Sequence, residues 1–164
     1  MIAHKNDSLP FAAVVSAPGF ALGVTTDEAE GVVTGIRFLP PTTALMIAQT
    51  PLAAKAVFQL CAWLKDTRFV FDLPMRAQGT EFQQRVWDQI RQIPPGETRT
   101  YDQLARALDT SPRPVGGACG ANPLPVLVPC HRVVASDGSL GGFAHERDGF
   151  FLEVKRWLLR HEEA

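Results

Sequence analysis

The order of apolar and polar positions divides the chain into two parts. In residues 11–39, short apolar runs alternate with a Pro-Gly pair and an acidic turn. Runs of this length between turn residues are typical of a small β-meander. Residues 51–66 instead place apolar side chains at helical spacing, with a proline where a first helical turn tolerates one. Residues 69–75, FVFDLPM, predict one further strand.

After Gly79 the pattern becomes mainly helical. Thr80 is placed to cap a helix over residues 82–93, and Thr100 to cap a second helix over residues 101–108. A short break then leads to a segment rich in small residues, and two helices joined in this way are typical of a helix-turn-helix, although ordinary helical packing also uses the motif. The apolar segment PVLVPCHRVV predicts a strand, and FFLEVKRWLLRHEE predicts a closing amphipathic helix.

The sequence therefore predicts an α+β fold. A small lobe of strands and one helix, residues 1–77, precedes a mainly helical domain, residues 78–164, that contains the helix-turn-helix. A chain of 164 residues has room for two such lobes but not for several large domains.

Composition narrows the class of protein further. The chain has 16 basic and 17 acidic side chains and a formal net charge of −1, which excludes a polyelectrolyte that holds nucleic acid by charge alone. Its three cysteines are an odd number without C-x-x-C spacing, so we expect no disulfide framework, no metal site and no other cofactor. The chain has no apolar leader and no run of membrane-spanning length, so we predict a cytoplasmic protein without a membrane partner.

Cys130 has the clearest chemical character of any residue in the chain. It lies in the sequence Val-Pro-Cys-His-Arg-Val, beside a potential base, His131, and a cation, Arg132. The thiolate is the nucleophilic form of cysteine, and nearby cations stabilise it. These residues alone leave two interpretations open, a nucleophile or a small apolar residue in a buried strand. Cys61 and Cys119 are expected to be packing residues.

Four sequence blocks, in order and at compatible spacing, carry a resemblance to a known family. They are GTEFQQRVW, IPPGETRTY, RPVGGACGANPLPVLVPCHRVV and KRWLLRHE, which together cover nearly all of residues 79–162. These blocks resemble the O6-alkylguanine-DNA alkyltransferases, also called methylated-DNA–protein-cysteine methyltransferases. The resemblance implies a single-turnover DNA repair protein that moves an alkyl group from guanine O6 to its own cysteine. It also implies a monomer that approaches double-stranded DNA from the minor groove.

The resemblance assigns catalytic roles to four residues. Cys130 is the nucleophile, and His131 takes its proton through a water molecule. Glu162 orients and stabilises the imidazole of His131, although by itself it would be interpreted as a solvated charge near the chain end. Tyr101 donates a hydrogen bond to the leaving guanine.

The resemblance also assigns residues to DNA and substrate binding. Arg113 enters the base stack in place of a flipped nucleotide, and the small residues Gly116, Gly117 and Ala118 let the helix approach DNA closely. The adjacent glycines are costly inside a helix, so they indicate a close approach either of DNA or of another helix. Further expected contributions come from Asn122, which forms an Asx turn before the active-site strand, and from backbone groups near Val133 and Ala144 that read the guanine edge.

Two further sequence features bear on binding. Residues 98–132 hold four arginines against Asp102 and Asp109, so the DNA-facing segment is expected to carry a local charge of +2. The segment HERDGFF, residues 145–151, replaces a shorter Gly-Gly turn of the family pattern and borders the expected alkyl pocket.

Three other functions compete with repair. A non-catalytic alkyltransferase-like protein that binds damaged DNA would lack the cysteine that this chain has. A cysteine hydrolase would use Cys130 and His131 but would also need an oxyanion hole. A helix-turn-helix regulator would have no use for the apolar segment around Cys130 beyond packing.

Overall fold

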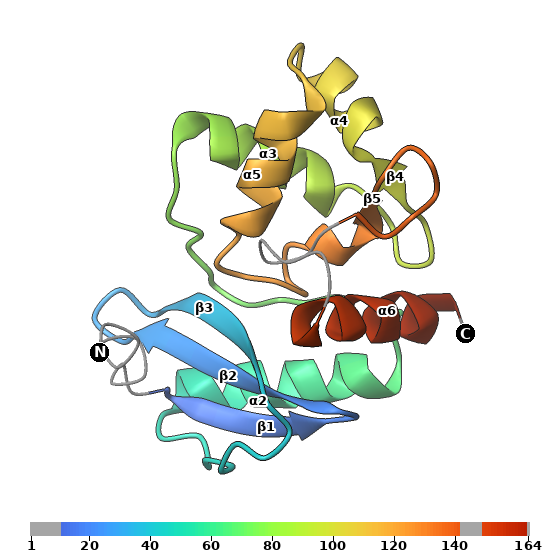
Figure 1. Ribbon diagram of the computed structural model, residues 1–164. Helices are drawn as coiled ribbons and strands as arrows, with labels where there is room; N and C mark the ends of the chain where they lie inside the picture. The colour runs from blue at the N-terminus through green and yellow to red at the C-terminus, as the bar shows by residue number, and fades with distance from the viewer. Residues whose placement is uncertain (1–10, 142–148, 164) are drawn as a thin grey trace, which may run out of the picture. The chain divides into compact units, whose positions relative to one another are not determined.

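The computed structural model describes residues 11–141 and 149–163 (Figure 1). The chain divides into two compact units, Met1–Arg76 and Ala77–Ala164. No helix among the described residues of either unit is long and apolar enough to cross a membrane.

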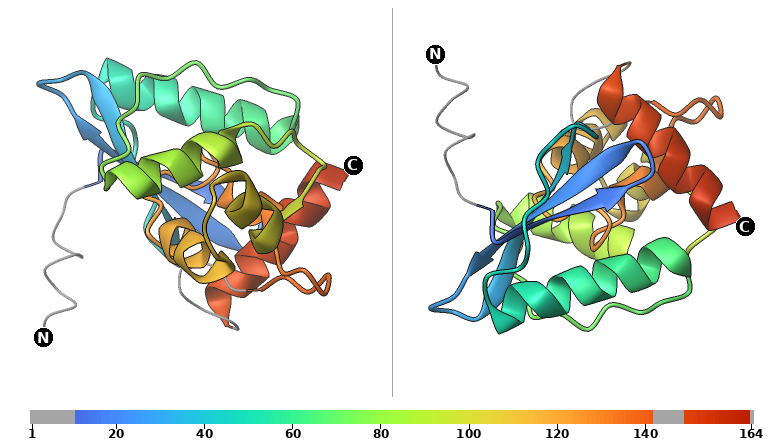
Figure 2. Two further views of the ribbon diagram at one scale, coloured as in Figure 1. Left: turned by 90° about the horizontal axis from the view of Figure 1, so that it is seen from above. Right: turned by 90° about the horizontal axis from the view of Figure 1, so that it is seen from below.

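The first unit is a three-stranded antiparallel sheet covered by one helix. The strands follow one another in the order β1 (Ala13–Ala17), β2 (Phe20–Asp27) and β3 (Val32–Leu39). Helix α2 (Pro51–Lys65) packs on all three strands and so covers one face of the sheet (Figure 2). Its buried face consists of Ala53, Ala56, Gln59, Leu60 and Trp63. The predicted meander and helix are confirmed.

The strand predicted over residues 69–75 is wrong. Only Met75 pairs with the sheet, through an isolated parallel bridge to Val33. The backbone of Asp72 is bonded instead to the side chain of Gln59, which donates to its carbonyl at 3.0 Å and accepts from its N–H at 2.8 Å. Because the side-chain amide of Gln59 satisfies both the N–H and the carbonyl of Asp72, the backbone at Asp72 needs no hydrogen bonds from a neighbouring strand.

The second unit is mainly helical and confirms the α+β class. It consists of α3 (Glu81–Arg91), β4 (Arg99–Thr100), α4 (Tyr101–Ala107), α5 (Pro112–Gly120), the 3-10 turn η1 (Cys130–Arg132), β5 (Val133–Val134) and α6 (Phe150–Glu163). Both predicted caps are present as full capping boxes, Thr80 with Gln83 and Thr100 with Gln103. The core of the unit includes Trp87, whose indole N–H donates to the carbonyl of Ala118 at 2.9 Å.

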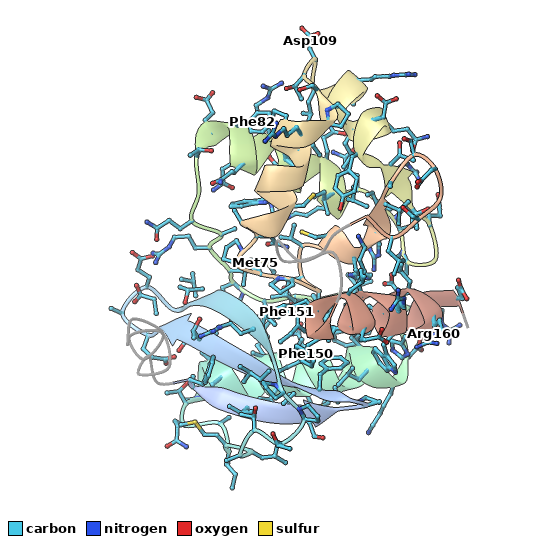
Figure 3. All side chains as sticks on the ribbon, viewed as in Figure 1. Met75, Phe82, Asp109, Phe150, Phe151 and Arg160 are labelled. Atoms are coloured by element: carbon cyan, nitrogen blue, oxygen red, sulfur yellow. The ribbon has the colours of Figure 1, made fainter. Side chains whose placement is uncertain are left out.

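Helices α4 and α5 form the predicted helix-turn-helix. Helix α5 packs against both α3 and α4, as Figure 1 shows. Asp109 lies at the tip of the turn between α4 and α5, with its side chain directed away from the helices (Figure 3). Its φ of 55° is in the left-handed region, which aspartate tolerates better than most residues.

The strand predicted over PVLVPCHRVV is largely wrong. Residues 130–132 form the turn η1, and only Val133–Val134 is a strand, paired in parallel with Arg99–Thr100. Three prolines in residues 123–129 remove backbone donors that a sheet ladder would require. Cys130 therefore lies in a 3-10 turn. Neighbouring side chains in a strand point to opposite faces, but this rule does not apply to Cys130 and His131 in such a turn.

We predict that Thr80→Ala lowers the free energy of unfolding by about 1 kcal/mol, because it removes the acceptor for the Gln83 N–H at the start of α3. Urea unfolding followed by tryptophan fluorescence measures the change. Thr98→Ala, at an exposed position between helices, is the matched control and should change stability by less than about 0.5 kcal/mol. Equal stabilities for the two variants would contradict the role of the cap.

Candidate active site

Cys130 is a buried thiol held by backbone and amide groups of the preceding turn. Its residue is 2% exposed. The side-chain amide of Asn122 donates to Sγ at 2.7 Å, and Sγ donates to the carbonyl of Cys119 at 3.6 Å. Its position is therefore fixed from two sides.

Asn122 organises the segment that carries this thiol. Its Oδ1 accepts from the N–H of Leu124 at 2.9 Å, which is the expected Asx turn, and its Nδ2 also donates to the carbonyl of Val128 at 2.8 Å. One amide thus joins the end of α5 to the residues immediately before Cys130. These contacts give Asn122 a positioning role within the protein.

A buried charge network lies directly after the thiol. His131 Nε2 is 2.7 Å from Glu162 Oε1, and Arg132 Nε lies 3.0 and 3.1 Å from the two carboxylate oxygens. Arg132 also donates through Nη2 to Glu162 and through Nη1 to the carbonyl of Ile93, the latter at 2.6 Å. The imidazole is fully buried and the Glu162 side chain is 1% exposed. The interpretation of Glu162 as a solvated terminal charge is therefore wrong.

The network sets the protonation of its members. Burial would raise the pKa of Glu162, but hydrogen bonds from His131 and Arg132 outweigh it and lower that pKa to about 2. Burial lowers the pKa of His131, with Glu162 opposing and Arg132 adding to the shift. At neutral pH the pair is therefore a carboxylate beside a neutral imidazole, which can accept a proton.

Lys155 is a site residue that the sequence reasoning missed. Its ammonium donates to the carbonyls of Val133 and Leu140 at 2.7 and 2.6 Å and lies 5.8 Å from the ring centroid of Tyr101. Burial lowers its pKa to about 8, while attraction to Cys119 and Cys130 opposes this shift. The sequence did hold a signal, since a lysine three residues from both Leu152 and Leu158 occupies the apolar face of a helix.

Tyr101 is the first residue of α4 and is half-buried. Its ring is close to Lys155 on one side and to the backbone of Gly141 on another. A Cβ at Gly141 would lie 2.9 Å from Tyr101 Cε2, and Gly141 has a φ of +72°. Only glycine satisfies both the close approach and the backbone conformation at this position.

The residues expected to face DNA divide into two groups. Arg113, at the start of α5, and Gly117 are exposed, and Gly116 is half-buried. Among the described residues, an added Cβ at Gly116 or Gly117 would meet no atom within 4 Å apart from the neighbouring backbone of α5 itself, so no other described helix explains these glycines. Ala118 is 3% exposed and faces the core, so its side chain does not belong to the exposed surface of α5, and its part in the approach to DNA stays a prediction.

The two residues expected to read the guanine edge are placed differently. Val133 is buried, and its carbonyl accepts from Lys155, although a carbonyl oxygen has a second lone pair. Ala144 lies outside the described residues, as do residues 145–148 of the expected insertion. Phe150 and Phe151, at the end of that segment, begin α6, as predicted for the closing helix.

The expected local charge of +2 is also corrected. Arg132 is buried and paired with Glu162, so it contributes nothing to a DNA-facing surface. Arg99 and Arg106 form ion pairs with Glu97 and Asp102. Arg113 is the only cation within α5. The expected binding of DNA by this helix would therefore depend on few charges.

A helix-turn-helix together with a buried cysteine that a His-Glu pair follows directly points to the class of proteins that act on DNA through a cysteine. Comparison with known proteins identifies the family within this class. The family model described as the DNA-binding domain of 6-O-methylguanine DNA methyltransferase matches residues 81–164. The chain belongs to this family, which confirms the resemblance found in the sequence.

Individual relatives extend over more of the chain. The constitutive methylated-DNA–protein-cysteine methyltransferase of Bacillus subtilis is 40% identical over 116 residues, which cover 70% of this chain and 68% of that protein. The bifunctional transcriptional activator and DNA repair enzyme Ada of Escherichia coli is 51% identical over 92 residues, 55% of this chain and 25% of that protein. The crystal structure of Mycobacterium tuberculosis OGT in complex with DNA superimposes with a TM-score of 0.73 at 32% identity, covering 92% of this chain and 91% of that chain.

We predict that Glu162→Gln lowers the free energy of unfolding by about 3 kcal/mol at pH 7, because it leaves the guanidinium of Arg132 buried without a counter-charge. The neighbouring Glu163→Gln, at an exposed position, is the control and should change stability by less than about 0.5 kcal/mol. Urea unfolding at a series of pH values measures both variants.

The same experiment tests the sign of the pH dependence. Since the folded pKa of Glu162 lies below its ordinary value of 4.5, its contribution is complete above that pH and is lost as pH falls toward about 2. Wild type and Glu163→Gln should both show this acid-side loss. Similar stability of the two glutamine variants at pH 7 would refute the buried network.

Proposed function

We propose that this protein repairs DNA by transferring the alkyl group of O6-alkylguanine irreversibly to Cys130. The observation that carries this proposal is the placement of the Cys130 thiol, held by Asn122 and followed directly by the buried His131–Glu162 pair. The family and its relatives support the activity. Direct damage reversal by alkyl transfer is the function most consistent with this arrangement.

The first step is transfer of a proton from Cys130 to His131. Nε2 of the neutral imidazole donates to Glu162, so Nδ1 receives the thiol proton through a water molecule. The imidazolium that forms is stabilised by the Glu162 carboxylate, which remains ionised throughout because Arg132 also binds it. Glu162 thus acts through His131 and does not contact the substrate.

The second step is a displacement at an sp³ carbon. The Cys130 thiolate attacks the alkyl carbon, a C–S bond forms, and the C–O6 bond breaks with its electron pair remaining on guanine O6. Tyr101 donates a hydrogen bond to the base as this charge develops. Lys155, 5.8 Å from the Tyr101 ring centroid, adds positive charge near the leaving base.

The target carbon lies within the base stack of duplex DNA, so the nucleotide must be flipped into the site. Arg113, exposed at the start of α5, fills the space that the nucleotide leaves. The open surface beside Gly116 and Gly117 allows α5 to approach the minor groove closely. Backbone groups near Val133 and Ala144 read the guanine edge.

The product limits each molecule to one reaction. The thioether on Cys130 is a poor leaving group, so the thiol is not restored and one equivalent of DNA is repaired. We further propose that residues 78–164 carry this chemistry, that the protein acts as a monomer, and that it works in the cytoplasm, where a reducing environment keeps Cys130 as a thiol.

We predict that incubation with a duplex containing O6-methylguanine adds about 14 Da to the protein, one methyl group in place of a hydrogen, at one equivalent. Intact mass spectrometry with peptide mapping should place the methyl group on Cys130. Cys130→Ala should bind the duplex and acquire no methyl group. Binding without any adduct in wild type would indicate a non-catalytic damage binder, whereas continuous release of methanol would indicate a hydrolase.

We also predict that Arg113→Ala slows repair of duplex DNA by at least about 10-fold while reaction with free O6-benzylguanine changes by less than about 2-fold, because only the duplex requires flipping. Single-turnover rates with each substrate measure the two effects. Arg91→Ala removes the same charge from α3, outside the helix-turn-helix, and is the matched control. Equal losses on both substrates in Arg113→Ala would rule out the flipping role.

A further inference from the structure

A second cysteine lies against the proposed nucleophile. Cys119 is in the last turn of α5 and is half-buried. Its carbonyl accepts a hydrogen bond from Cys130 Sγ at 3.6 Å, and interaction with Cys130 is the first cause of the raised pKa of the Cys119 thiol. The sequence reasoning treated Cys119 as a packing residue, but the structure places it beside the reactive group.

We infer that Cys119 and Cys130 form a reversible disulfide under peroxide stress, which switches off alkyl transfer and protects the nucleophile from irreversible oxidation. This inference rests on the proposed function, since it requires Cys130 to be the alkyl acceptor. Disulfides in reducing compartments are usually transient and regulatory. A protein whose thiol serves only once loses its entire activity if that thiol is oxidised beyond recovery.

The chemistry balances with hydrogen peroxide as the oxidant. The Cys130 thiolate attacks one peroxide oxygen, the O–O bond breaks, and hydroxide leaves, which gives a sulfenic acid on Cys130. The Cys119 sulfur then attacks the Cys130 sulfur, an S–S bond forms, and the Cys119 proton leaves with the displaced hydroxyl as water. Two thiols are oxidised and one peroxide is reduced to two waters.

The surroundings distinguish the roles of the two thiols. Asn122 donates to Cys130 Sγ at 2.7 Å, and the same amide can stabilise a thiolate or a sulfenate. The hydrogen bond to Cys130 and burial raise the pKa of Cys119 well above its ordinary value, so Cys119 stays protonated until Cys130 has reacted. Cys130 is therefore the thiol that peroxide attacks, and Cys119 the one that resolves the sulfenic acid.

The geometry places the two cysteines next to each other. A disulfide needs sulfurs about 2.0 Å apart and β-carbons within about 4.5 Å. Because Cys130 Sγ lies 3.6 Å from the carbonyl oxygen of Cys119, the two residues are neighbours, and rotation of their side chains is the movement that would bring the sulfurs together. Cys119 is next to Gly120, the last residue of α5, where backbone adjustment is less restricted than in the helix interior.

The test compares Cys61→Ala, which retains the pair, with Cys61→Ala/Cys119→Ala, which lacks the resolving thiol. Cys61 lies on α2 in the other unit, so its removal leaves one possible intramolecular disulfide. Each protein is treated with hydrogen peroxide, quenched, and divided into samples with and without dithiothreitol. Methyl transfer from an O6-methylguanine duplex is measured relative to the same variant before oxidation.

We predict that peroxide lowers the mass of Cys61→Ala by about 2 Da and gives one cross-linked peptide that joins Cys119 to Cys130. Its rate of methyl transfer should fall by at least about 10-fold, and dithiothreitol should restore it. The variant without Cys119 should form no cross-link, gain about 32 Da on Cys130 and remain inactive after reduction. Cys119→Ser in the same background repeats the comparison with a side chain of similar size, in case the alanine variant folds poorly.

Peptide mapping and activity report on different claims. Two results would overturn the switch and leave the repair function intact. In the first, reduced protein is active, but oxidation gives sulfinic acid on Cys130 without a cross-link. In the second, dithiothreitol restores the variants with and without Cys119 equally. Reduced protein that transfers no methyl group would overturn the repair function and, with it, the switch, even where the cross-link forms.

Discussion

The buried carboxylate of Glu162 is the interaction on which the active unit depends. It accepts hydrogen bonds from both His131 and Arg132, and Arg132 continues to the carbonyl of Ile93. Three segments that are distant in sequence, the end of α3, the turn η1 and the end of α6, therefore meet at one charge. Removing any one of these side chains would leave a buried polar group unsatisfied. The network therefore constrains the relative positions of the three segments more tightly than apolar packing alone would.

Helix α6 forms one side of the site through two ionisable residues on its apolar face. Glu162 supports His131, and Lys155 supports Tyr101 and the backbone at Val133 and Leu140. Burying both groups is unfavourable for stability, since each must be desolvated. What they contribute is fixed geometry and charge near Cys130, because two positions on one helix contact His131 and the ring of Tyr101 at once.

The features that sequence could predict were those set by local chemistry. Thr80 and Thr100 were recognisable as caps, and Asn122 as a turn residue, because their partners lie two or three residues away. The missing strand over residues 69–75 and the burial of Arg132 depend on partners 13 and 30 residues away, Gln59 and Glu162. Lys155 and Cys119 likewise could not be predicted from local sequence, since only the folded chain brings them near Cys130.

The contacts that hold Cys130 are also those that the proposed alkyl transfer would change. Cys130 Sγ accepts from Asn122 at 2.7 Å and donates to the Cys119 carbonyl at 3.6 Å in a site that is almost fully buried. A thioether has no proton to donate, so alkylation would end the hydrogen bond to the Cys119 carbonyl. Because Asn122 also bonds Val128 and Leu124, a change in its hydrogen bond to the sulfur would act on the turn that joins α5 to η1. A site that reacts once can tolerate this change, since it never has to return to its starting geometry.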